Sequence, residues 1–258
     1  MGDREKKTVL FEQVARVGKA LGSGKRLELL DLLAQGERSV EHLAAAAQLG
    51  LSTTSAHLQV LRQAGLVTTR REGTRVHYAL AGLDVFRLYE QLRNVAGEHV
   101  ADVSRAREDY LGSGRTSEAL EPGYGSVHGS LHESSPDSAQ EVSRDELLNR
   151  VAAGAVTVLD VRPGEEYAAA HIPGAISIPM DELSQRIDEL PSDQEVIAYC
   201  RGAYCVLAYE AVDLLRAAGR SALRLHEGML EWRVNELPVE SNPTHTGPAA
   251  RRLTSTGQ

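Results

Sequence analysis

The sequence predicts two domains, a mainly α-helical first domain and an α/β second domain built on a mainly parallel sheet. A chain of 258 residues is long enough for two medium domains. Apolar residues recur at helical spacing up to about residue 110, whereas short apolar runs alternate with helical stretches after about residue 142. Between these parts Gly, Ser, Pro and Glu dominate, and the apolar periodicity disappears. We therefore expect folded domains at 1–111 and 141–240, a flexible linker at 112–140 and a disordered tail at 241–258.

Composition and charge narrow the class of protein. The apolar content of 42% is ordinary for a globular chain, and no apolar run approaches the roughly 18 residues that span a bilayer. The first residues lack the apolar segment of a secretion signal, so we expect a cytoplasmic protein with no membrane partner. The net charge of −8 divides unevenly: residues 1–115 carry 17 basic and 14 acidic side chains, and residues 116–258 carry 11 and 22. The mildly basic first half is compatible with binding to nucleic acid, whereas the acidic second half is not.

The first domain is expected to contain four helices, a β-hairpin and a long closing helix. Ser39 and Ser52 stand where helix N-caps are expected, and glycines follow the second, third and fourth helices. Gly73 marks a tight turn between two short strands. The expected helices lie at about 9–21, 23–36, 40–49, 52–65 and 84–110, and the expected strands at 66–70 and 75–79.

The third and fourth helices are joined by a short glycine-containing turn and followed by a β-hairpin. This order describes a winged helix-turn-helix, in which the later helix of the pair, here the fourth at 52–65, reads DNA. The outward residues of that helix are polar groups suited to base edges and phosphates: Ser52, Thr53, Thr54, Ser55, His57, Gln59 and Arg62. The hairpin tip adds Arg70, Arg71 and Arg75, which suit phosphates or the minor groove. The alternative is a helical dimerisation module with an ordinary solvated face.

The segment 49–78, LGLSTTSAHLQVLRQAGLVTTRREGTRVHY, resembles the core of the ArsR/SmtB family of dimeric winged-helix repressors. The resemblance covers about 10–110 and implies a homodimer bound to double-stranded operator DNA of two-fold symmetry. It also implies an interface formed by residues of the first and last helices: Val9, Val14, Val17, Phe86, Leu88, Tyr89 and Leu92.

The sensing sites of that family are not matched. Its metalloid sensors carry paired cysteines at the start of the third helix, where this chain has the cysteine-free run 38–41. Of the family's zinc site on the last helix, only His99 and Asp102 have suitable spacing, and a closed zinc site needs four good ligands. We therefore expect no metal site and no cofactor, and we keep zinc sensing through His99 and Asp102 as an alternative hypothesis.

The second domain alternates strands with helices, and the only two cysteines of the chain lie in one of its loops. Strands are expected at 156–160, 175–178, 195–199 and 222–225, and helices at about 180–189 and 206–218. Cys200 falls between a strand end and a helix start, where free backbone N–H groups and the helix dipole favour a thiolate. The candidate catalytic loop is the run Cys200, Arg201, Gly202, Ala203, Tyr204 and Cys205. Within it we expect Gly202 to permit a close backbone approach and Arg201 to lower the pKa of the Cys200 thiol.

Three stretches resemble the rhodanese (sulfurtransferase) family over about 142–240. They are the DVRP, EY and HIPGA motifs between 160 and 175, the Cys200 loop, and Gly228-Met229 followed by Trp232. The resemblance implies that Cys200 accepts a sulfane sulfur from a donor such as thiosulfate or polysulfide and becomes a persulfide, which the loop amides of 201–205 would cradle. The whole order of domains resembles fusions of an ArsR-type repressor to a rhodanese. We expect Asp160, Arg162 and His171 to anchor the fold rather than to react, because most such groups are satisfied partners.

The loop departs from the usual rhodanese pattern, Cys-x-x-Gly-x-Arg. Cys205 stands where the arginine that holds thiosulfate would be, and Ala203 stands where a glycine is usual. Cys205 either resolves the persulfide, releasing sulfide and leaving a disulfide with Cys200, or packs as a small buried group. A phosphatase-like or arsenate-reductase site needs Cys-x5-Arg, and because Val206 occupies that position we do not expect this class.

Together these features predict a dimeric DNA-binding transcriptional regulator, expected to be a repressor, whose rhodanese domain carries a persulfide on Cys200 and senses or transfers reactive sulfur. The alternative is primarily a thiosulfate or polysulfide sulfurtransferase with a helical dimerisation or autoregulatory first domain. The sequence leaves open whether Cys200 turns over as an enzyme.

Overall fold

A computed structural model describes residues 3–112 and 141–242 of the chain. These residues pack into two compact units. The first unit joins 3–89 to 165–171 and 239–242, and the second joins 90–112 and 141–164 to 172–238. Each unit therefore contains residues of both predicted domains. Linker residues 113–140 and tail residues 243–258 lie outside the described residues.

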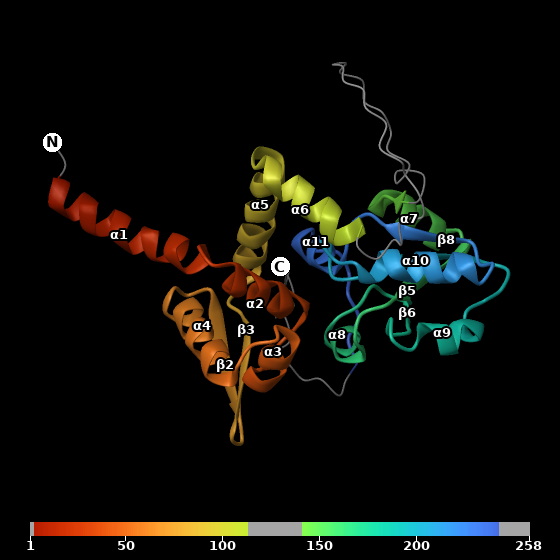
Figure 1. Ribbon diagram of the computed structural model, residues 1–258, viewed down its shortest axis with the longest axis horizontal. Helices are drawn as coiled ribbons and strands as arrows, with labels where there is room; N and C mark the ends of the chain where they lie inside the picture. Colours follow the sequence, from red (N-terminus) through yellow and green to blue (C-terminus); the bar gives the residue numbers. More distant parts are fainter. Residues whose placement is uncertain (1–2, 113–140, 243–258) are drawn as a thin grey trace, which may run out of the picture. The chain divides into compact units, whose positions relative to one another are not determined.

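Four helices form the N-terminal part of the first unit (Figure 1): α1 (Arg4–Leu21), α2 (Gly24–Gln35), α3 (Val40–Ala46) and α4 (Leu51–Gln63). The Ser39 hydroxyl accepts a hydrogen bond from the His42 N–H and caps α3, as predicted. The prediction that Ser52 caps α4 is wrong, because Gly50 is the N-cap and Ser52 lies in the first turn. Helix α3 is shorter than predicted because Gln48 adopts a left-handed conformation, with φ of 51°.

An antiparallel sheet of order β1-β3-β2 adds the wing to this unit, and Figure 1 shows its hairpin projecting beyond the helices. Its strands are β1 (Arg38–Ser39), β2 (Val67–Glu72) and β3 (Arg75–Leu80). The hairpin is longer than predicted and turns at Gly73, whose φ of 59° is open to glycine at no steric cost. Buried leucines of α2, α3 and α4 form the core: Leu29, Leu33, Leu43, Leu58 and Leu61.

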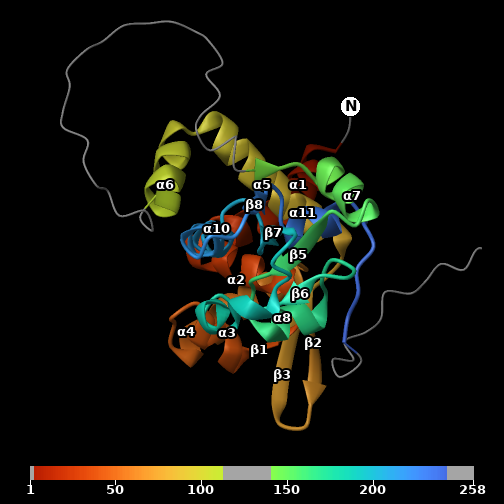
Figure 2. The same cartoon turned by 90° about the vertical axis from the view of Figure 1, so that its right-hand side faces the viewer.

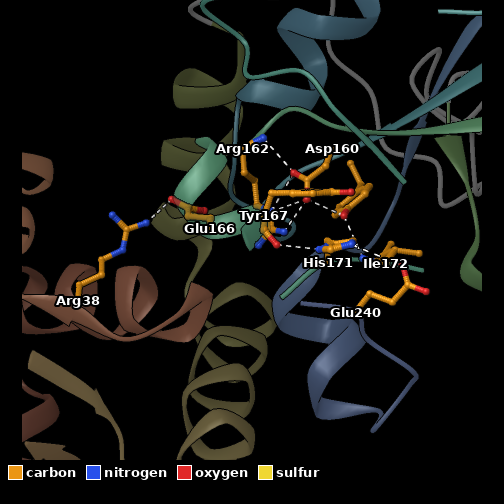
Figure 3. Close-up of polar contacts among 9 residues, drawn as sticks. Arg38, Asp160, Arg162, Glu166, Tyr167, His171, Ile172 and Glu240 are labelled. Atoms are coloured by element: carbon orange, nitrogen blue, oxygen red, sulfur yellow. Dashed lines mark hydrogen bonds and ion pairs between the residues drawn. The ribbon is translucent and has the colours of Figure 1, made fainter. Parts of the chain in front are cut away.

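A buried ion pair ties β1 to helix α8 (Gly164–Ala169) within the first unit (Figure 3). Arg38 Nη2 lies 2.5 Å from Glu166 Oε1, and its Nη1 lies 2.8 Å from Glu165 Oε1. Because Arg38 and Glu166 are both buried, each charge depends on the other to offset the loss of water.

The single closing helix predicted at 84–110 is instead two helices, α5 (Leu83–His99) and α6 (Ala101–Gly112), with a break at Val100. The Ser104 hydroxyl donates to the Gly97 carbonyl at 3.3 Å. In an uninterrupted helix that carbonyl would accept from the backbone N–H of residue 101. The side-chain hydrogen bond therefore satisfies a group that the break leaves open.

The second unit contains a five-stranded parallel sheet of order β4-β8-β7-β5-β6 (Figure 2), which confirms the predicted parallel α/β fold. Its strands are β4 (Glu141–Val142), β5 (Val156–Asp160), β6 (Ile176–Ser177), β7 (Glu195–Tyr199) and β8 (Ala222–Leu225). Strands β5, β7 and β8 match the predicted ranges, β6 is shorter, and β4 has no counterpart in the prediction. Both cysteines belong to the core on this sheet, together with Leu159, Val196, Ala198, Ala208 and Leu215.

The helices of the C-terminal part are α7 (Arg144–Ala152), α8, α9 (Leu183–Arg186), the 3₁₀ helix η2 (Ile187–Glu189), α10 (Leu207–Ala217) and α11 (Met229–Val234). Helix α10 agrees with the prediction, whereas α7, α8 and α11 have no predicted counterpart. The predicted helix at 180–189 shrinks to α9 and η2, because a turn in which the Pro179 carbonyl accepts from the Glu182 N–H occupies its start. Among the described residues, no helix has both the length and the apolar character required to cross a membrane.

Candidate functional site

The cysteine loop lies between the end of β7 at Tyr199 and the start of α10 at Leu207, as the sequence predicts. Cys200 and Cys205 are free thiols, 2% and 8% exposed respectively. The loop therefore brings two free thiols to the carboxyl end of a central parallel strand, the edge at which such sheets place ligands.

The two thiols have opposite pKa shifts. Burial and the hydrogen bond with Cys205 raise the pKa of the Cys200 thiol well above its usual value. The hydrogen bond that Cys205 accepts from Cys200 lowers the pKa of the Cys205 thiol. Cys205 is thus the first of the pair to ionise, and the Cys200 thiol donates to the Cys205 backbone carbonyl at 3.5 Å.

Helix α11 fixes the position of the loop. The Met229 N–H donates to the Cys200 carbonyl at 3.0 Å. A Cβ added to Gly228 would lie 2.3 Å from the Gly202 nitrogen, so a glycine is required for this close backbone approach. The predicted Gly228-Met229 motif therefore shapes the cysteine loop directly.

The predicted cradle of loop amides is only partly directed at Cys200. The N–H groups of Gly202 and Ala208 favour the charged form of its sulfur. The Ala203 N–H instead points to the Glu231 carboxylate at 3.5 Å. Sequence analysis missed both Ala208 and Glu231, although the helix start at 207 could have indicated an N–H donor from the first turn of α10.

Two further loop residues act away from Cys200. The positive charge and backbone N–H of Arg201 lower the pKa of Cys205, rather than that of Cys200 as predicted. The Tyr204 hydroxyl donates to the Arg93 carbonyl at 3.3 Å, a contact within the second unit that the sequence did not predict. Within the predicted catalytic run, Arg201 thus acts on Cys205, and Tyr204 contacts α5.

A buried polar network stands at the ends of β5 and β7 (Figure 3). Arg162 Nη2 donates to Asp160 Oδ2 at 2.5 Å, and both side chains are completely buried. The Tyr199 hydroxyl donates to the same Asp160 oxygen at 2.6 Å and accepts from the Ile172 N–H at 3.1 Å. These contacts support the structural role expected for Asp160 and Arg162.

His171 is anchored in the first unit (Figure 3). Its Nδ1 lies 2.8 Å from the Tyr167 carbonyl, and the two rings stack with centroids 3.7 Å apart. Its backbone exchanges two hydrogen bonds of 2.9 Å with that of Glu240. The expected structural role of His171 is thus supported as well.

The predicted DNA-reading residues of α4 differ in exposure. The prediction that Thr54 points outward is wrong, because this residue lies on the core side of the first turn and is fully buried. Its hydroxyl donates to the Gly50 carbonyl at 3.1 Å. The others reach the surface to different extents: Ser52, Thr53, Gln59 and Arg62 are exposed, and Ser55 and His57 are half-buried.

The three wing arginines also differ. Arg70 Nη2 lies 2.5 Å from Glu37 and its Nη1 lies 3.0 Å from Glu72, and these hydrogen bonds raise the pKa of its guanidinium. Arg71 and Arg75 are exposed at the hairpin tip. Arg71 and Arg75 therefore remain exposed at the tip, whereas Arg70 is paired with Glu37 and Glu72.

The residues considered for a metal site point to local partners. His99 Nε2 lies 3.7 Å from Glu98 Oε2, and Asp102 Oδ1 lies 3.6 Å from Arg105 Nη1. Within the described ranges, no three His, Cys, Asp or Glu side chains are grouped as metal ligands would be.

Two family models match the chain. "Bacterial regulatory protein, arsR family" matches residues 23–69, and "Rhodanese-like domain" matches residues 143–235. The chain is therefore of the class that joins an ArsR-type winged helix-turn-helix to a rhodanese-like domain. It is 52% identical over 239 residues to the HTH-type transcriptional regulator Rv0324 of Mycobacterium tuberculosis, a match that covers 93% of this chain and 95% of that relative. The chain belongs to this family of ArsR-type transcriptional regulators with a rhodanese domain.

Other relatives match one part each. A sulfurtransferase of Allochromatium vinosum is 32% identical over 101 residues, which cover 38% of this chain and 92% of that protein. The homodimeric winged helix-turn-helix DNA-binding domain of Mb0332 from Mycobacterium bovis is 54% identical, with a TM-score of 0.37, and the match covers 40% of this chain and 94% of that fragment.

Proposed function

We propose that this regulator acts as a homodimeric repressor on double-stranded operator DNA and takes up reactive sulfur on Cys200. The observation that carries the sulfur proposal is the buried pair of Cys200 and Cys205 at the end of a parallel strand, with the Cys200 sulfur 3.5 Å from the Cys205 carbonyl oxygen. DNA contact is supported by the exposed polar face of α4 and by Arg71 and Arg75 at the wing tip.

The pKa difference between the thiols gives the order of the sulfur step. The Cys200 sulfur attacks one sulfur of a hydrodisulfide anion, HSS⁻. At the same time the Cys205 thiolate accepts the Cys200 proton. The S–S bond of the donor breaks, and its electron pair leaves with sulfide. The balanced step is Cys200–SH + Cys205–S⁻ + HSS⁻ → Cys200–S–S⁻ + Cys205–SH + HS⁻. The N–H groups of Gly202 and Ala208 then face the charged persulfide.

We propose further that Cys205 resolves the protonated persulfide. Its thiolate attacks the Cys200 sulfur, and the outer sulfur leaves with the electron pair of the broken S–S bond. The balanced step is Cys200–S–SH + Cys205–S⁻ → Cys200–S–S–Cys205 + HS⁻.

The test is fluorescence anisotropy of a labelled duplex from the upstream region of the chain's own gene, at fixed salt because affinity depends on it. Full-length protein is compared fully reduced and after treatment with sodium tetrasulfide. We expect the treatment to change the affinity by about tenfold or more, a typical allosteric effect. Cys200→Ser should not respond. Cys205→Ser, which lacks both the base and the resolving thiol, should gain sulfur more slowly but retain the persulfide, detected by intact mass.

The outcomes separate the two functions. Unchanged tight DNA binding by treated wild-type protein would reject sulfur sensing. If the protein binds no upstream DNA but transfers sulfur from thiosulfate to cyanide, and Cys200→Ser abolishes this transfer, the protein is instead primarily a sulfurtransferase. The similarity to a protein named sulfurtransferase favours keeping this second candidate.

A further inference from the structure

We propose that Tyr204 and Arg93 are positioning residues that couple the cysteine loop to helix α5, so that sulfur uptake on Cys200 alters α5. The proposal rests on the proposed function, because it supplies the route by which the sulfur site would reach the helical part of the regulator. All its contacts lie within the second unit.

Tyr204 is the point of contact on the loop. It directly precedes Cys205, and its hydroxyl donates to the Arg93 carbonyl at 3.3 Å. The Arg93 guanidinium lies over the Tyr204 ring at 4.2 Å from the centroid, and that of Arg107 from α6 lies 5.7 Å from the same centroid. One loop side chain thus contacts α5 through both its hydroxyl and its ring, with a cation–π contribution from two helices.

Arg93 joins the loop by a second route through Glu231 of α11. Arg93 Nη2 lies 3.7 Å from Glu231 Oε1. The Glu231 carboxylate in turn accepts from the Gly228 N–H at 2.9 Å and from the Ala203 N–H at 3.5 Å. Arg93 is only 8% exposed, so its charge is poorly hydrated and its interactions with the loop are correspondingly strong.

The surface of α5 is shaped to accept Tyr204. Gly97 lies one helical turn after Arg93 and on the same face. A Cβ added to Gly97 would lie 3.3 Å from the Tyr204 hydroxyl oxygen, closer than ordinary contact. Gly97 lies in the last turn of α5, and its lack of a side chain leaves room for the tyrosine.

Sulfur uptake must disturb this contact because the loop is closely packed. Cys200 is almost completely buried, so an added sulfur atom or a Cys200–Cys205 disulfide requires its neighbours to move. The peptide bond to Cys205 transmits that movement to Tyr204. Through Tyr204 the movement reaches Arg93, next to Leu92, which belongs to the helix that the family resemblance assigns to the dimer interface.

Hydrogen–deuterium exchange of the full-length protein tests the coupling without DNA. On treatment with sodium tetrasulfide we expect the backbone amides of α5 near 90–97 to change exchange rate by about threefold or more in the wild type, but not in Cys200→Ser. Arg93→Met should gain sulfur by intact mass as the wild type does, yet lose the response in α5. Arg105→Met on the exposed face of α6 is the matched control and should respond like the wild type. Arg93→Lys, which keeps the cation, should retain part of the response.

The outcomes distinguish this proposal from the proposed function. If wild-type Cys200 gains sulfur and α5 does not respond, or if Arg93→Met responds fully, the coupling is overturned. If α5 responds but affinity for the upstream duplex is unchanged, the coupling stands and sulfur-dependent repression fails. If Cys200 does not gain sulfur at all, both are rejected.

Discussion

At the scale of single residues, the unequal pKa values of the two thiols follow from what each sulfur contacts. Burial is the main influence on Cys200, whereas an accepted hydrogen bond is the main influence on Cys205. Because the thiolate is the reactive form, the proposed uptake requires that Cys200 stay protonated until a sulfur donor enters and Cys205 removes its proton. In that proposal, Cys200 is the nucleophile and Cys205 the base, two residues of one loop.

The hydrogen bond from Cys200 can be tested by removing its donor. Cys200→Ala should raise the pKa of the Cys205 thiol towards the ordinary value of 9.0, because the largest cause of its lowering is lost. The ultraviolet absorbance of the thiolate against pH measures this midpoint. In the reciprocal variant Cys205→Ala, the Cys200 thiol should still titrate above 9.0, since burial remains. An unchanged Cys205 midpoint in Cys200→Ala would show that the two sulfurs do not share a proton.

The Tyr199 hydroxyl is the second residue-scale feature with a measurable effect. Tyr199→Phe removes the donor to Asp160 and the acceptor for the Ile172 N–H, both buried. We expect a loss of roughly 1–3 kcal/mol in the free energy of unfolding. Urea unfolding followed by the fluorescence of Trp232, the single tryptophan, reports on this unit. The control Tyr110→Phe on the exposed side of α6 should change stability by less than about 0.5 kcal/mol, and equal losses would contradict the assigned network.

At the scale of secondary-structure elements, the two-residue strand β4 is held by a charged cluster. The Glu141 carboxylate pairs with Arg224 of β8 and lies 2.6 Å from His226 Nδ1. Burial alone would raise the pKa of Glu141, but the hydrogen bonds from His226 and Arg224 outweigh it and lower the value to about 2. The same contact raises the pKa of His226.

These shifts predict how the cluster responds to pH. The contribution of Glu141 is complete above its ordinary pKa of 4.5 and is lost as pH falls towards about 2. The contribution of His226 is complete below its ordinary pKa of 6.5 and is lost as pH rises through its raised value. Glu141→Gln should therefore lower the free energy of unfolding most between about pH 4.5 and 6.5, by roughly 1 kcal/mol for a partly exposed pair. Urea unfolding across pH measures this, and a cost that does not vary with pH would refute the assigned ionisation.

The sequence predicts some elements well and others not at all. Strands β5 and β7 are short runs of buried apolar residues between turn signals, so the pattern alone locates them. Strand β4 has two residues and α11 has six, and neither length carries a periodic signal. Such elements form because tertiary contacts hold them, as Arg224 holds β4. At the break at Val100, the Ser104 hydroxyl satisfies the Gly97 carbonyl that the break leaves open.

Prediction of the site has the same limit. The order and spacing of motifs locate Cys200 and Cys205 in their loop, because a strand and a helix flank it in sequence. Glu231 and Arg93 lie far away in the sequence and reach the loop only through the fold. Thr54 was assigned to the outward face of α4, yet its register in the first turn buries it.

At the scale of the whole molecule, α1 presents an apolar face that the described residues leave exposed. Its Val9, Leu10, Phe11 and Val14 are all more than half exposed. Isolated apolar residues on a surface are common, but four on one helix form a patch of the kind that marks a protein interface. The face includes two of the positions that the family resemblance assigns to the dimer interface, Val9 and Val14, which supports the proposed homodimer.

Substitution on this face should separate dimerisation from folding. Phe11 is 60% exposed, so Phe11→Glu should leave the monomer folded. In a two-fold dimer the substitution occurs twice, and each buried aromatic contributes about 1.5–3 kcal/mol, so dimerisation should weaken by roughly 100-fold or more. Sedimentation equilibrium measures this directly. Affinity for the upstream duplex should fall as well, because a monomer contacts only half of a two-fold operator. The control Leu148→Glu changes an apolar residue exposed on α7 and should leave the dimer intact. A Phe11→Glu protein that remains fully dimeric would place the interface elsewhere on the chain.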